Sequence, residues 1–244
     1  MSAVLAIMRR ELRSYFVTPL AYVFLVIFLL MSAFLTFYIG DFYERGLADL
    51  QPFFSFHPWL YLMLAPAMTM RLWAEERKSG TLELLLTLPV TITRAMLGKF
   101  LAAWAFIGLA LVLTFPMWLT VNYLGSPDNG VILAGYFGSW LMAGNFLAIG
   151  CCLSALTRSQ VVAFIITAAM CFALVLAGFS GVRDALNGLV PTQAVTMLAQ
   201  FSILQHFQAI ARGVLDLRDV VYFLTGIVVW LTAGVLVLEL KRTG

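Results

Sequence analysis

The chain has 244 residues, of which 62% are hydrophobic and 11% are charged, and its formal net charge is +3. A soluble globular domain carries roughly 25% charged residues, so this composition excludes that class and indicates an integral membrane protein. The small positive charge requires no nucleic acid as a partner, because basic residues gathered on one side of a membrane account for it.

Residues 1–17 are predicted to form an amphipathic helix, because Ile7, Leu12 and other apolar residues recur at helical spacing. The basic residues Arg9, Arg10 and Arg13 gather away from that apolar face. Such a helix lies in the membrane interface with its basic side toward anionic lipid head groups. The alternative interpretation is a simple orientation signal for the span that follows, and the two roles are compatible.

A spanning helix needs about 20 predominantly apolar residues, and six uncharged runs meet this requirement. The predicted fold is all-α, with six transmembrane helices at 18–40, 53–72, 96–121, 131–156, 160–179 and 220–239. A seventh uncharged run, 185–211, is rich in polar side chains and is interrupted by Gly188 and Pro191. Unpaired polar groups are costly in hydrocarbon. We therefore expect short extracytoplasmic helices over 183–215.

The distribution of basic residues predicts the orientation of the chain. Of the 15 Lys and Arg residues, 11 fall on the side that holds both ends of the chain and the loop 71–99. Loops rich in Lys and Arg remain on the cytoplasmic side. Both termini and the 71–99 loop are therefore expected in the cytoplasm.

Small residues within the spans are predicted to be packing positions. Gly144, Ala148 and Cys152 recur at four-residue spacing, which lets two helix backbones of the same chain approach closely. Cys151, Cys152 and Cys171 lie in predicted spans, with no His or carboxylate at metal-ligand spacing. We interpret them as small apolar core residues rather than as a disulfide or a metal site.

Several kinds of chemistry have no motif in this sequence. No phosphate-binding loop of the form Gly-x-x-x-x-Gly-Lys-Ser/Thr occurs, and neither do the hydrolase motif Gly-x-Ser-x-Gly and the zinc motif His-Glu-x-x-His. The uncharged runs that define the spans also lack the ionisable group that ion-coupled carriers usually need. The chain is thus predicted to bind no cofactor and to be neither an intramembrane enzyme nor a proton-coupled carrier. This favours a membrane channel or gate moved from outside the bilayer.

The stretch 71–89 is the best candidate for a contact with a driving partner. Its charged residues Glu75, Glu76, Arg77 and Lys78 are expected to extend the second span into the cytosol. Gly80 then lets the chain turn, and Ser79 or Thr81 can cap a new helix. That helix carries Glu83 in its first turn, the apolar residues Leu82, Leu84, Leu85, Leu86 and Leu88, and Pro89 at its end. Its apolar surface fits either a groove on a protein partner or the surface of the lipid.

The same stretch resembles a family motif. Residues 74–89, Ala-Glu-Glu-Arg-Lys-Ser-Gly-Thr-Leu-Glu-Leu-Leu-Leu-Thr-Leu-Pro, are similar to the region after the second span in ABC-2 type ABC transporter permeases. The gliding-motility-associated (GldF-like) permeases are closer still, since they share Pro-Trp-Leu at 58–60 and Pro-Ala-x-Thr-Met-Arg at 66–71. Residues 211–219 resemble that group and the NosY-like permeases.

The resemblance implies a six-span permease of type V exporter-like architecture. It implies an N-terminal interfacial helix, a cytoplasmic coupling helix at 79–89 and short outer helices between the fifth and sixth spans. Carried over by residue, Glu75, Glu76 and Arg77 form the charged lead-in, Gly80 and Thr81 the turn, and Glu83, Leu84, Leu85 and Leu86 the docked helix that Pro89 ends.

Partners are likewise implied by the resemblance. The coupling helix docks on a P-loop ATPase subunit that acts as a dimer and binds ATP and Mg²⁺. A second permease domain, identical or related, completes the assembly in the bacterial inner membrane, where an auxiliary extracytoplasmic protein can join it. The alternative function is a membrane scaffold or anchor subunit without a transport path.

Overall fold

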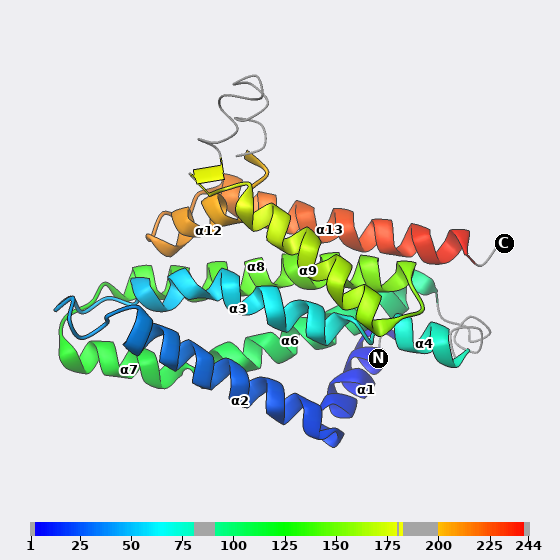
Figure 1. The fold of residues 1–244 in the computed structure, drawn as a ribbon, viewed down its shortest axis with the longest axis horizontal. Coiled ribbons are helices and arrows are strands. Elements are labelled where there is room, and N and C mark those ends of the chain that lie inside the picture. The colour runs from blue at the N-terminus through cyan, green and yellow to red at the C-terminus, as the bar shows by residue number, and fades with distance from the viewer. Residues whose placement is uncertain (1–2, 81–90, 180, 183–199, 242–244) are drawn as a thin grey trace.

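The computed structural model describes residues 3–80, 91–179, 181–182 and 200–241, and all regular structure within these residues is helical (Figure 1). The N-terminal half contains α1 (Ala3–Val17), α2 (Pro19–Phe34) continuing into the π-helix η1 (Leu35–Ile39), α3 (Gln51–Thr69), α4 (Ala74–Ser79), α6 (Ile92–Leu113) and α7 (Phe115–Leu124). The C-terminal half contains α8 (Asn129–Leu156), α9 (Gln160–Leu176), α12 (Ile203–Ala211) and α13 (Leu217–Leu240).

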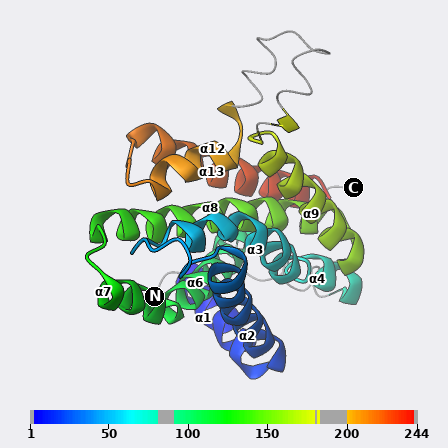
Figure 2. The same ribbon diagram turned by 60° about the vertical axis from the view of Figure 1, so that its left-hand side comes forward.

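Helix α8 is the centre of the bundle, and Figure 2 shows it between α13 on one side and α6 on the other. Of its 28 residues, 20 are buried, and it packs against α3, α6, α9, α12 and α13. A Cβ atom on Gly144 would lie 3.0 Å from Ile227 of α13, and one on Gly234 of α13 would lie 3.2 Å from the Cα of Cys152. The predicted small-residue face is thus confirmed as a packing face, and its neighbours are α13 and, at Gly144, Trp104 of α6.

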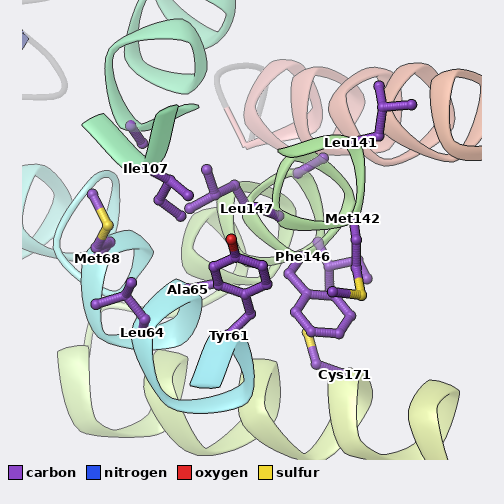
Figure 3. Packing of buried hydrophobic residues seen from close by; sticks show 14 of the residues in the cluster. Tyr61, Leu64, Ala65, Met68, Ile107, Leu141, Met142, Phe146, Leu147 and Cys171 are labelled. Atoms are coloured by element: carbon purple, nitrogen blue, oxygen red, sulfur yellow. The ribbon is translucent and has the colours of Figure 1, made fainter. Parts of the chain in front are cut away.

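The apolar core joins α3, α6, α8 and α9 (Figure 3). Tyr61 of α3, Ile107 of α6 and Phe146 of α8 are among its fully buried side chains. Cys151 and Cys171 are also fully buried in this cluster. Their interpretation as packing residues is therefore confirmed.

Four helical segments in the described part of the chain are long and apolar enough to cross a membrane. They are Ala21–Ile39, Ile92–Leu124, Asn129–Leu156 and Leu217–Leu240, and they coincide with four predicted spans. The predicted spans 53–72 and 160–179 correspond to α3, with 19 residues, and to the shorter apolar helix α9, with 17.

The third predicted span is not one straight helix. Helix α6 ends at Leu113, and α7 begins at Phe115 with Pro116 in its first turn. A proline has no backbone N–H and its ring clashes with the preceding turn, so it fits the start of a helix better than the middle. The Thr114 hydroxyl covers the break by donating to the Leu111 carbonyl at 2.6 Å.

Helix α12 lies within the range 183–215 predicted for the outer helices, of which 183–199 lies outside the described residues. It begins after Ser202, whose hydroxyl accepts from the Leu204 N–H, and it ends before Gly213, which has a φ of +87°. The Gly213 N–H bonds the Ile210 carbonyl and the Val214 N–H bonds the Ala209 carbonyl. This pair of bonds is a Schellman motif, in which Gly213 ends the helix.

His206 fastens α12 to the start of α13. Its Nδ1 lies 2.6 Å from Oδ1 of the buried Asp219, its Nε2 lies 2.9 Å from the Gln200 carbonyl, and its ring stacks on Tyr222 with centroids 3.9 Å apart. A carboxylate and a carbonyl both accept hydrogen bonds. Each ring nitrogen of the imidazole thus contacts one of these acceptors.

Candidate functional site

The chain turns a corner between α3 and α4, at the lead-in to the predicted coupling segment. The Ser154 hydroxyl of α8 accepts from the Trp73 and Ala74 N–H groups at 3.3 and 3.2 Å and lies 3.3 Å from the Met70 carbonyl, which it can reach as a donor. Trp73 is fully buried beside this contact. The prediction that residues 75–78 simply extend the second span is therefore wrong, because α3 ends at Thr69 and α4 is a separate helix.

A buried lysine joins three helices at this corner. Lys99 of α6 is only 3% exposed, and its Nζ lies 2.7 Å from Oε1 of Glu76 in α4 and 3.4 Å from Oε1 of Glu11 in α1. The same Nζ lies 5.3 Å from the centroid of the Trp73 ring. We call Lys99, Glu76 and Glu11 the charged junction.

The charged junction fixes the relative positions of α1, α4 and α6 more than it adds to the free energy of unfolding. Removing charges from water costs several kcal/mol per ion, which offsets most of their mutual attraction. Losing one member leaves a charge without compensation in a poorly solvated place. Any movement of α4 relative to α6 or α1 is therefore opposed, so the three helices are held as one unit.

Helix α1 is pressed closely onto α6 beside the charged junction. A Cβ atom at Gly98 would lie 2.7 Å from Cγ2 of Ile7, so only glycine allows this approach. Further along, the rings of Tyr15 and Phe106 meet edge to face with centroids 5.7 Å apart. The predicted basic residues Arg9, Arg10 and Arg13 are all exposed.

Two cations reach the C-terminal end of α8 next to the junction. Nη1 of Arg77 donates to the Ala155 carbonyl at 3.0 Å, and Nζ of Lys241 donates to the Ala155 and Leu156 carbonyls at 3.3 and 2.7 Å. Positive charge is favourable at a helix C-terminus. Burial, together with the positive charge of Arg158, lowers the pKa of Arg77. Burial, together with the positive charges of Arg77 and Arg158, lowers the pKa of Lys241. The cations thus crowd one another while capping α8.

The predicted site residues fall into two groups. The structure brings Glu76 and Arg77 into contact with other helices and leaves Glu75 exposed. Gly80 ends α4 with a φ of +74°, which confirms a glycine turn at this point. Thr81, Glu83, Leu84, Leu85, Leu86 and Pro89 lie outside the described residues, as does all but the start of the predicted coupling helix 79–89.

Ser79 lies at the end of α4, and Thr91 lies at the start of α6. The Ser79 hydroxyl donates to the Glu75 carbonyl at 2.9 Å, so it belongs to the end of α4. The Thr91 side chain accepts from the Arg94 N–H and caps α6.

Sequence reasoning missed the roles of Lys99 and Glu11. Lys99 stands where the predicted loop 71–99 meets the predicted span 96–121, and Glu11 stands within the predicted helix 1–17. One signal was available: Glu11 is the single acidic residue among Arg9, Arg10 and Arg13. An acid in a basic cluster that faces lipid head groups is unfavourable unless a cation holds it.

The described residues contain no group of three or more His, Cys, Asp or Glu side chains placed to hold a metal ion. Around the charged junction, the structure shows a mechanical connection between helices, with carboxylates held by a lysine and carbonyls held by cations.

Comparison with known proteins identifies the family. The model of the family described as ABC-2 family transporter protein matches residues 5–240. The comparison with curated proteins gave no match. The match extends over nearly the whole chain and agrees with the all-helical bundle and its apolar spanning helices. The chain therefore belongs to the ABC-2 family and is a membrane permease subunit of an ABC transporter.

Proposed function

We propose that this chain couples ATP hydrolysis by separate P-loop ATPase subunits to substrate export, or to mechanical work, across the bacterial inner membrane. The charged junction is the observation that carries the proposal. It connects α4 to α6 and α1, and only Gly80 lies between the end of α4 and residues 81–90. A force applied to the coupling segment 79–89 thereby reaches the membrane helices directly.

The proposed topology has six spans with both termini in the cytoplasm. Helices α3 and α9 are proposed as the two spans that join the four segments Ala21–Ile39, Ile92–Leu124, Asn129–Leu156 and Leu217–Leu240. Figure 1 supports this arrangement, because α1, α4 and the end of α13 lie toward one end of the bundle and α7 and α12 toward the other. The cations Arg77, Arg158 and Lys241 gather at the first end, as the preference of basic residues for the cytoplasmic side requires.

Force passes through α4 by two routes. Glu76 leads to Lys99 in α6 and, through it, to Glu11 in α1. Arg77 leads to the end of α8, the central helix. Helix α4 has only six residues and is followed by Gly80. A push on the coupling segment is therefore passed to the helices that Glu76 and Arg77 contact. The proposed motion tilts α3 and α6 with respect to α8.

The assembly is proposed to contain two permease domains and an ATPase dimer that binds ATP and Mg²⁺. The motifs at 58–60, 66–71 and 74–89 favour the gliding-motility-associated subtype. The apolar residues of the spans suit ordinary helix packing as well as a lipid-like or peptide cargo.

Replacing a leucine of the coupling segment tests the proposed ATPase contact. Leu85→Arg places a charge on the apolar side that docks, and we expect the amount of co-purified ATPase to fall by about tenfold or more. Leu47→Arg is the matched control, because Leu47 is exposed in the loop before α3, on the proposed outer side. Glu83→Arg repeats the test at the start of the segment.

ATP turnover separates a permease from a scaffold. A permease subunit changes ATP turnover when it assembles with the ATPase, whereas an anchor leaves it unchanged. Equal association and equal turnover for Leu85→Arg and Leu47→Arg would refute the coupling proposal.

A further inference from the structure

A cavity of about 350 Å³ opens beside the charged junction, within the range of about 300–1,000 Å³ that is typical of small-molecule sites. Five elements surround it: α1, α2, α3, α4 and α6. Its walls contain both strongly polar and strongly apolar side chains. The cavity is therefore built for an amphiphile rather than for a uniformly polar or apolar ligand.

The two kinds of side chain are separated along the helices. Of the charged lining residues, Arg71, Glu75 and Glu76 lie at the corner between α3 and α4, and Glu11 and Lys99 reach it from within α1 and α6. Of the apolar lining residues, Ala21 and Met68 lie near the ends of α2 and α3, whereas Phe24 and Phe106 lie farther into α2 and α6. Phe106 is seven residues beyond Lys99, which is about 10 Å along α6. The polarity of the cavity thus changes in the direction in which a phospholipid passes from head group to acyl chain.

The charges that line the cavity have mixed sign. Three carboxylates, from Glu11, Glu75 and Glu76, face two cations, from Arg71 and Lys99. Lys99 is already held by two of the carboxylates, whereas Arg71 and Glu75 are exposed and form no ion pair within the described residues. Sites for anionic lipids are clusters of basic residues. An acidic excess disfavours a net negative head group and favours one that carries both an ammonium and a phosphate.

Tyr15 adds a polar group without a partner. Its hydroxyl oxygen is buried and has no hydrogen-bond partner within the described residues, although the side chain lines the cavity. Burial, reinforced by Glu11, raises the pKa of Tyr15, so the hydroxyl keeps its proton and remains a donor. A buried donor of this kind calls for an acceptor, and a phosphate oxygen is one.

We propose that this cavity binds the head group of a zwitterionic phospholipid with a primary ammonium, of the phosphatidylethanolamine type, from the cytoplasmic leaflet. Glu75 receives the ammonium, and Arg71 receives the phosphate. Placement in that leaflet rests on the proposed function. A lipid held there contacts α1, α2 and α4 at once, so it adjusts the stiffness of the connection that the charged junction provides.

Native mass spectrometry of the full-length purified chain tests the site without any ATPase. The chain is offered equal mixtures of phosphatidylethanolamine, phosphatidylcholine and phosphatidylglycerol, and the retained lipid is measured. We expect phosphatidylethanolamine to be retained preferentially, because a choline group has no N–H to donate to Glu75. Arg71→Gln and Glu75→Gln are each expected to lower that preference by about fivefold.

Two exposed residues that do not line the cavity give matched controls. Arg94→Gln and Glu239→Gln make the same chemical changes in α6 and α13 and are expected to keep the preference. Equal retention of the three lipids, preference for phosphatidylglycerol, or equal losses in variants and controls would overturn the proposal. Displacement by soluble glycerophosphoethanolamine would show that no acyl chain is needed and would overturn the lipid assignment. Because no ATPase is present, these results are independent of the coupling test with Leu85→Arg.

Discussion

Replacing Lys99 by methionine removes the positive charge of the junction and nearly preserves the length of the side chain. At an effective dielectric constant of 20, the attraction of Nζ to Glu76 at 2.7 Å is about 6 kcal/mol and that to Glu11 at 3.4 Å about 5 kcal/mol, before desolvation is subtracted. Removing one partner of a buried pair usually costs about 3–5 kcal/mol. The carboxylate side chains of Glu11 and Glu76 retain 15% and 19% of their exposure, and water therefore relieves part of the loss. We expect Lys99→Met to lower the free energy of unfolding by about 3 kcal/mol.

The assay is equilibrium unfolding of the purified chain in mixed micelles. Lys78→Met is the matched control, because Lys78 is exposed in α4. The same substitution there should change the free energy of unfolding by less than about 0.5 kcal/mol. A double-mutant cycle with Glu76→Gln then isolates the direct pair. We expect a coupling energy of about 1–3 kcal/mol.

Two outcomes would refute this reasoning. If Lys99→Met is as stable as Lys78→Met, the lysine is not held by the carboxylates as the structure places it. If the cycle gives a coupling energy below about 0.5 kcal/mol, the two side chains act independently and the junction does not fasten α4 to α6.

Three further predictions concern neighbouring contacts. Gly98→Val should lower the unfolding free energy by about 1–3 kcal/mol, because its side chain meets Ile7, and a stability equal to wild type would contradict the close approach of α1. His206→Phe keeps the ring stacking but loses two hydrogen bonds, so amide hydrogen exchange at the start of α12 should accelerate by more than about tenfold. Unchanged exchange would show that His206 does not hold α12 to α13. Arg77→Met and Lys241→Met should each lower the free energy of unfolding only slightly, because the remaining cation still caps α8 and the repulsion between the two is relieved. The double variant should lower it by more than the sum of the two single effects, and additive effects would disprove the shared cap.

Much of the fold follows from hydrophobic run length. The predicted spans 131–156 and 220–239 coincide with α8 and α13, since a span in lipid must satisfy its backbone hydrogen bonds internally and helices do so. The break between α6 and α7 was missed, although Pro116 marks it. In an apolar run, the residues alone do not show whether a proline bends a helix or ends it.

The candidate site was only partly predictable. Periodicity and charge singled out Glu76, Arg77 and Gly80, because each acts locally, as a charge beside a span or as a residue for a turn. Lys99 and Glu11 are 88 residues apart, and their ion pair exists only because α1 packs on α6. Sequence patterns report short-range geometry, so a contact created by packing between distant segments lies beyond them.

ATP turnover of the complete complex in proteoliposomes tests the central claim, that the charged junction carries force from the coupling segment into the membrane helices. The complex with Lys99→Met is compared with that containing Lys78→Met, at equal amounts of bound ATPase. We predict that the ATP turnover that depends on this chain falls by about threefold or more in Lys99→Met alone. Equal turnover in the two complexes would contradict the account.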